Sequence, residues 1–118
     1  MTQGGKRFNQ EKPKLGLISA LAKAGMARVL MFGMQKYDAW NWQKGLDISE
    51  TLESLERHID CIRAGELIDE ESGLPHVDHM QCNTMFLSHF FHSGQWDELA
   101  KTLPPRYGLE DRPPLDNN

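Results

Sequence analysis

The segment between Asp47 and Gly65 constrains the fold more than any other part of the chain. Its apolar side chains recur at spacings of four and three residues, at Ile48, Leu52, Leu55, Ile59 and Ile62. This period places them on one face of an α-helix. Asp47, followed by Glu50 three residues later, forms a capping-box pattern at the start, and Gly65 suits the end. The segment therefore predicts a helix with one buried face.

Three further segments are predicted to be helical. The stretch from Leu15 to about Gly33 predicts a first helix of four or five turns. Pro75 suits the first turn of a third helix that runs from His76 to His92, and residues 96–103 predict a short fourth helix. Strand patterns are almost absent. The predicted class is all-α, a small bundle of three to four helices.

The two ends of the chain differ from this helical middle. Residues 1–14 are polar and carry Lys6, Arg7, Lys12 and Lys14, which predicts a flexible arm. Residues 15–103 form the predicted helical domain. Residues 104–118 contain four prolines and predict an extended or disordered tail.

Charge and hydropathy exclude two classes of partner. The net charge of −4 argues against a general nucleic-acid binder, which normally presents a basic face. The longest apolar stretch is interrupted by Lys23, Gly25 and Arg28, so it is too polar to cross a membrane, and no signal peptide is recognisable. We expect neither nucleic-acid nor membrane partners. We expect a cytoplasmic location, which is the host cytoplasm if the chain is encoded by a phage.

Cys61 and Cys82 lie in helical patterns and are expected to be small buried thiols.

Polar residues occur on helix faces that are otherwise apolar. His76, His79 and Asn83 share one face of the third helix, and His58 lies at the border of the apolar stripe of the second. Burying imidazoles destabilises a fold unless they are hydrogen-bonded or coordinated. These residues are therefore either satisfied polar groups in the core or parts of a site.

The histidines adjoin an acidic loop, "GELIDEESGLPHVDH". Glu66 and Asp69 lie three residues apart there, as do Glu53 and Glu56 on the preceding helix. Carboxylates at this spacing can converge on one hard divalent cation. Because carboxylates outnumber imidazoles, Mg²⁺ or Mn²⁺ fits better than zinc. The alternative is a solvated acidic loop. The loop lacks the residue spacing of an EF-hand. The sequence also contains neither a P-loop motif nor a nucleophile-elbow motif.

The order of these residues resembles a known family. The chain carries Lys12-Pro13, Gly33, Lys36-Tyr37, Asn41-Trp42, Arg57-His58, Gly65-Glu66, Asp69, Glu71-Ser72-Gly73, Pro75-His76, His79 and Asn83. In this order they resemble the phage and bacterial dATP/dGTP diphosphohydrolases, an all-α group near the MazG-like nucleoside triphosphate pyrophosphohydrolases. The match covers roughly residues 12–90.

The resemblance implies an enzyme that hydrolyses purine deoxynucleoside triphosphates to monophosphate and pyrophosphate, and so controls the deoxynucleotide pool. It implies Mg²⁺ or Mn²⁺, with Glu53, Glu56, Glu66 and Asp69 as metal ligands, because an acidic site binds a triphosphate only through cations. Glu71 or His58 would take the proton of the attacking water. The implied substrate-binding residues are Lys12, Lys36, Tyr37, Asn41, Trp42, His76, His79 and Asn83, with Trp40 as a further stacking candidate.

Several alternatives stay open at this point. If Lys36 does not bind substrate, it is an ordinary cation at the end of a helix, where it interacts with the helix dipole. If Trp42 does not bind substrate, it is an anchor of the core. The chain as a whole is otherwise a non-catalytic module that sequesters nucleotides or binds a partner, or a purely structural helical protein. The MazG-like relatives imply a homo-oligomer, either a dimer or a tetramer.

Overall fold

The computed structural model describes residues 4–6 and 10–103, and these residues are helical with no named strand. The elements are η1 (Leu15–Leu17), α1 (Ala20–Lys36), η2 (Asn41–Lys44), α2 (Ile48–Arg63), α3 (His76–His92) and α4 (Trp96–Leu99). The predicted all-α class is confirmed. The proposed tail, 104–118, and part of the proposed arm lie outside the described residues.

Local sequence explains where α1 and α2 begin. The Asp47 carboxylate accepts a hydrogen bond from the Glu50 backbone N–H at 3.0 Å, which caps α2 as predicted. The first helix differs from the prediction, because Ser19 caps α1 through the Ala22 N–H and separates it from the single turn of η1. α4 ends at Leu99 and is therefore shorter than the predicted 96–103 helix.

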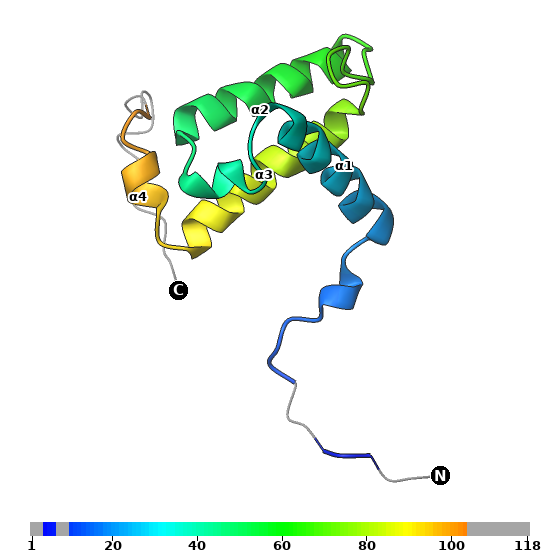
Figure 1. Ribbon diagram of the computed structural model, residues 1–118, viewed down its shortest axis with the longest axis vertical. Helices are drawn as coiled ribbons and strands as arrows, with labels where there is room; N and C mark the ends of the chain where they lie inside the picture. Colours follow the sequence, from blue (N-terminus) through cyan, green and yellow to red (C-terminus); the bar gives the residue numbers. More distant parts are fainter. Residues whose placement is uncertain (1–3, 7–9, 104–118) are drawn as a thin grey trace, which may run out of the picture.

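α2 and α3 lie side by side and antiparallel, and α1 packs against α3 (Figure 1). The approach of α1 to α3 depends on Gly25, since a Cβ there would lie 2.3 Å from Asp78 Oδ1. Two side chains of α3 tie the helices together: the Gln81 amide donates to the Ala22 carbonyl at 2.7 Å, and the Cys82 thiol to the Met26 carbonyl.

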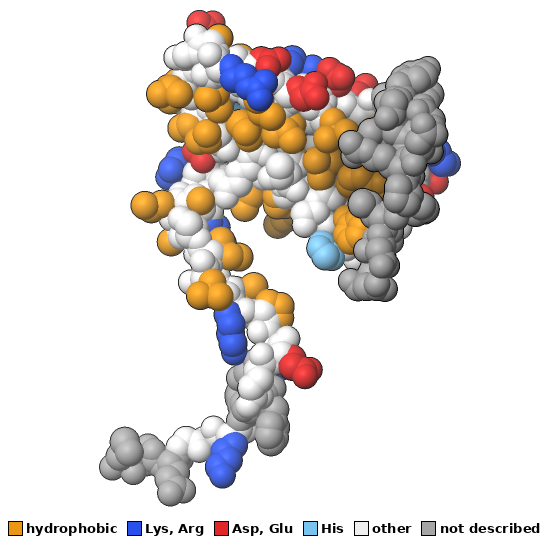
Figure 2. Space-filling model, turned by 180° about the vertical axis from the view of Figure 1, so that it is seen from behind, with side chains coloured by type: hydrophobic (Ala, Val, Ile, Leu, Met, Phe, Trp, Pro, Cys, Tyr) orange, Lys and Arg blue, Asp and Glu red, His pale blue; other side chains and the backbone are white. Residues whose placement is uncertain are grey.

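The core is small and lies where α1, η2 and the start of α2 meet α3. Ile48 and Phe90 are fully buried, and Val29 and Cys82 nearly so. By contrast, η1 and the first turn of α1 project from the helical body and expose apolar side chains, which Figure 2 shows in orange. Within the described residues, no helix has both the length and the apolar character that a membrane span requires.

Candidate functional site

Three imidazoles meet between α2 and α3. His58 Nδ1 lies 2.8 Å from His76 Nδ1, and the His58 and His79 rings stack at 4.7 Å. Burial is the largest cause that lowers the pKa of His58, and the neighbouring His79 and His76 lower it further. Burial likewise lowers the pKa of His79, against the opposing effect of Asp69. The cluster therefore favours neutral imidazoles, which can accept protons or bind metals.

Asp69 is held beside this cluster by Ser72. The Ser72 backbone N–H and hydroxyl both donate to Asp69 Oδ2, at 2.8 and 2.7 Å, and the same hydroxyl oxygen lies 2.7 Å from His79 Nε2. Partial burial alone would raise the pKa of Asp69, but the two hydrogen bonds from Ser72, together with His79, hold it below 3.8. Asp69 is thus an ionised carboxylate with a fixed orientation.

The end of α2 forms a second group of possible ligands. The Gly65 N–H bonds the Ile62 carbonyl and the Glu66 N–H bonds the Cys61 carbonyl, the two bonds of a Schellman motif. This turn places Glu66 beside Cys61, and His76 lies next to both. Partial desolvation, followed by the hydrogen bond and charge of Glu66, raises the pKa of the Cys61 thiol.

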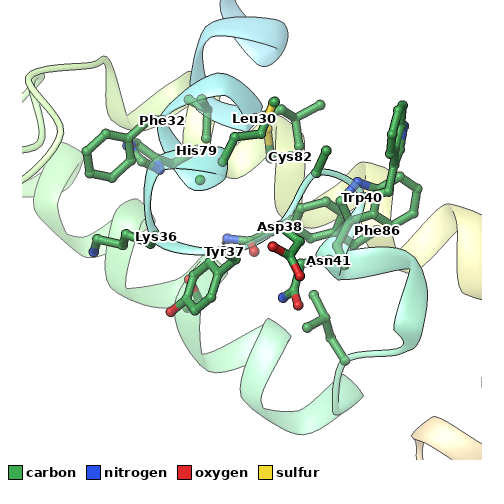
Figure 3. A pocket seen from close by; sticks show the side chains of 18 of the residues that line it. Leu30, Phe32, Lys36, Tyr37, Asp38, Trp40, Asn41, His79, Cys82 and Phe86 are labelled. Atoms are coloured by element: carbon green, nitrogen blue, oxygen red, sulfur yellow. Dashed lines mark hydrogen bonds between the residues drawn. The ribbon is translucent and has the colours of Figure 1, made fainter.

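A cavity of about 550 Å³ opens beside the imidazoles. Figure 3 shows it between the end of α1, the start of η2 and α3. One end is polar, with side chains from five residues: Lys36, His58, Asp69, Glu71 and His79. The other end is aromatic, with Trp40, Trp42 and Phe86, whereas Tyr37 lies beside Lys36 (Figure 3). A cavity of this size holds a ligand as large as a nucleotide.

Two tryptophans contribute differently to the aromatic end. Trp42 stacks on Phe86 at 5.1 Å and meets His89 edge-on at 4.8 Å, so it anchors the fold as well as lining the cavity. Trp40 is 70% exposed and has a backbone φ of 58°, in the left-handed region. A non-glycine residue in this region stores strain, and such residues cluster at functional sites.

The cavity brings together most of the residues predicted from the sequence. Of the predicted substrate and catalytic residues, it is lined by Lys36, Tyr37, Asn41, Trp42, His58, Glu71, His79 and Asn83. Lys36 forms an ion pair with Glu71, so the predicted cation and the predicted base neutralise each other. His76 lies beneath His58, 2% exposed, and Lys12 is an exposed residue of the N-terminal segment.

The four predicted metal ligands are not gathered at one point among the described residues. Asp69 groups with His58 and His76, whereas Glu66 groups with Cys61 and His76. Glu53 and Glu56 are exposed on α2 and belong to neither group, so their role stays a prediction.

Sequence reasoning missed Cys61, Ser72 and Phe86. Cys61 lies three residues after His58 and so shares its helix face, a signal that could have marked it as more than a core thiol. Ser72 follows Asp69 by three residues, the spacing of a local carboxylate–backbone turn. For Phe86 the sequence holds no comparable signal, because its place depends on how η2 docks on α3.

Comparison with known proteins assigns the chain to a family. A profile described as "dATP/dGTP diphosphohydrolase, N-terminal" matches residues 2–99. The chain belongs to this family. It is also similar to a protein of Salmonella phage PMBT28 named "dATP/dGTP diphosphohydrolase", with 39% identity over 83 residues. That match covers 70% of the chain but only 28% of the phage protein. No solved structure matches the chain.

Proposed function

We propose that the chain hydrolyses dATP and dGTP, with water, to the deoxynucleoside monophosphate and pyrophosphate. The observation that carries the proposal is the cavity, whose lining is polar at one end and aromatic at the other and whose volume of about 550 Å³ is that of a site for a nucleotide-sized ligand. Family membership and the name of the phage relative support the same substrates. Because the chain spans about a quarter of that relative's length, the activity of this chain by itself needs a direct test.

The aromatic end suits the base. Trp40 at this end is 70% exposed, and Tyr37, beside Lys36, is 60% exposed, so both rings are accessible for stacking. Trp42 is already packed against Phe86 and supports the wall from behind. The Asn83 Nδ2 donates to Ser54, at 3.2 Å, which leaves its carbonyl oxygen to accept a hydrogen bond from a ligand. Asn41 lines the same end and offers both a donor and an acceptor.

The polar end suits the phosphates, provided that the Lys36–Glu71 pair opens. Both side chains are well exposed, at 45% and 64%, so the pair is weak and exchangeable. A triphosphate is a stronger partner for Lys36 than one carboxylate, because it carries several charges. Once Lys36 binds a phosphate, the Glu71 carboxylate is free to accept the proton of the attacking water.

We propose a divalent cation at the polar end. Asp69 with His58 and His76 would hold it, and this mixture of one carboxylate and two imidazoles fits Mn²⁺ better than Mg²⁺. Such an ion supplies charge screening for the triphosphate and a lower pKa for the attacking water. Ser72 keeps Asp69 ionised and oriented, and the stacked His79 shields the group from solvent. By acting on free deoxynucleotides, the chain would serve a phage in the host cytoplasm.

The test is product analysis by ion-exchange chromatography. Each dNTP and NTP is incubated with the chain and Mn²⁺ or Mg²⁺, alongside Asp69→Asn and, as a matched control, Asp97→Asn on the exposed face of α4. We expect monophosphate and pyrophosphate from the wild type and Asp97→Asn, and at least a hundredfold less from Asp69→Asn, as for loss of a key electrostatic group.

Two results would contradict the proposal. Diphosphate with phosphate would show a different reaction. Nucleotide retained by the chain without any product would instead favour a module that sequesters nucleotides, with catalysis dependent on segments such as those that the longer phage relative contains.

A further inference from the structure

We propose that Cys61, Glu66 and His76 bind a zinc-class divalent cation at the end of α2, outside the nucleotide cavity. The inference goes beyond the proposed hydrolysis, since neither Cys61 nor Glu66 lines that cavity. The site would fix the junction between α2 and α3 rather than contact the substrate.

The backbone brings the three ligands together without help from the metal. Gly65, with a φ of 92°, closes the Schellman turn that sets Glu66 beside Cys61. The chain then returns through a short hairpin, in which the His76 N–H bonds the Leu67 carbonyl at 2.9 Å. One atom from each of Cys61, Glu66 and His76 lies within 4.8 Å of the others. The ligands of a tetrahedral zinc ion lie roughly 3.3–3.8 Å apart, so only a small adjustment of flexible side chains is required.

An unpaired nitrogen points into this group. His76 is 2% exposed, and among the described residues its Nε2 has no hydrogen-bond partner. The nearest carboxylate oxygen, Glu66 Oε2, lies 3.6 Å away, which is too long for a hydrogen bond. A buried polar atom without a partner costs about 1–3 kcal/mol, so its retention calls for a ligand. A cation between Nε2 and Glu66 supplies one, since their separation already matches that of two zinc ligands.

The other nitrogen of His76 has the partner that a metal-bound histidine needs. His76 Nδ1 lies 2.8 Å from His58 Nδ1, and with the proton on His76 it donates to His58. That arrangement leaves the lone pair of Nε2 directed at Cys61 and Glu66. Metal-ligating histidines are oriented in this way by a hydrogen bond from their second nitrogen.

The donor set selects the class of metal. A thiolate, an imidazole and a carboxylate suit Zn²⁺, whereas Mg²⁺ and Ca²⁺ prefer oxygen ligands. Binding replaces the thiol proton of Cys61, which is released to solvent, so the two anionic ligands balance the two charges of the ion. Water fills the fourth position. The Glu66 side chain is 42% exposed, which gives the ion a path from solvent.

Cobalt titration tests this site without nucleotide. Co²⁺ replaces Zn²⁺ in such sites, and a cobalt–thiolate bond produces a charge-transfer band in the near ultraviolet. The chain has two cysteines, so Cys61→Ser and Cys82→Ser form a matched pair. Cys82 is buried between α1 and α3, where its thiol donates to the Met26 carbonyl. We expect one equivalent of Co²⁺ to give the band in the wild type and Cys82→Ser but not in Cys61→Ser. Zn²⁺ should abolish the band and raise the melting temperature.

Three results would overturn the proposal. These are the absence of a thiolate band in a folded wild type, a band that survives Cys61→Ser, or a band that survives Glu66→Gln with unchanged affinity. The first would mean that His76 and Glu66 are bridged by water instead. Because the titration needs no substrate, its outcome is independent of whether the chain hydrolyses nucleotides.

Discussion

At the scale of single residues, Trp40 combines backbone strain with an accessible ring. The left-handed conformation costs a non-glycine residue about 1–2 kcal/mol, and Asn adopts it more readily than Trp. Because Trp40 is 70% exposed, its removal loses little apolar burial. We predict that Trp40→Asn raises the unfolding free energy by up to about 1 kcal/mol, while nucleotide affinity falls about tenfold through lost stacking.

Trp40→Phe is the matched control, since it keeps both an aromatic ring and the strain. Thermal denaturation and equilibrium dialysis with dATP measure the two effects. The interpretation fails if Trp40→Asn is less stable than Trp40→Phe, or binds dATP as tightly.

The imidazole cluster predicts a dependence of stability on pH in the metal-free chain. In the folded state the pKa values of His58 and His79 lie below the ordinary 6.5. As the pH falls from about 7 to about 5, the unfolded chain therefore binds protons that the folded chain does not, and the free energy of unfolding decreases. Urea denaturation across this range, with EDTA present, measures the slope. His58→Gln should flatten it, whereas the same change at the exposed His92 should not; equal slopes would contradict this account.

At the scale of the elements, two helices end in the same way and allow a controlled comparison. Gly65 after α2 and Gly94 after α3 both have positive φ, 92° and 78°, and a Cβ at either would meet open space. Alanine at either position should cost about 1 kcal/mol through backbone strain alone. Only Gly65→Ala should also weaken Co²⁺ binding, because only that turn carries Cys61 and Glu66. Equal Co²⁺ affinity of the two variants would show that the turn at Gly65 does not position the metal ligands.

The packing of α1 on α3 predicts opposite effects at two glycines of α1. At Gly25 a Cβ would lie 2.3 Å from Asp78 Oδ1, so Gly25→Ala should destabilise the fold by about 1–3 kcal/mol through overpacking. At Gly33 a Cβ would meet open space, so Gly33→Ala should stabilise by up to about 1 kcal/mol through helix propensity. Chemical denaturation distinguishes them. Equal stability of the two variants would mean that α1 is not held against Asp78.

These elements also show which features of the fold and the site can be predicted from the sequence. The stripe of α2 and the Pro75 signal of α3 are local, and α3 has the predicted bounds, His76–His92. The face shared by His76, His79 and Asn83 is predictable for the same reason, because it follows from the period of a single helix. The Lys36–Glu71 and Trp42–Phe86 contacts join segments far apart in the chain. They depend on the docking of α1 and η2, which no local period encodes.

At the scale of the whole molecule, the projecting segment favours self-association. Leu15, Leu17 and Leu21 are 73%, 86% and 86% exposed, and an apolar surface of this kind usually meets a partner. We predict a homo-oligomer, a dimer or tetramer, that Leu17→Glu with Leu21→Glu dissociates. Light scattering after gel filtration gives the mass, with Leu67→Glu as a control at another exposed apolar position. A monomeric wild type at micromolar concentration would rule the prediction out.

The position of His76 between the two ligand groups has a further consequence for the molecule. A neutral imidazole has a single lone pair. Zinc on Nε2 would therefore fix the proton on Nδ1, and that proton would occupy the Nδ1 lone pair of His58, 2.8 Å away. Neither nitrogen of this pair is then available to a Mn²⁺ ion beside Asp69. The two ions should oppose each other by negative linkage, and each should weaken the other by the same factor. A chain that holds both ions in this way would sense the ratio of zinc to manganese around it.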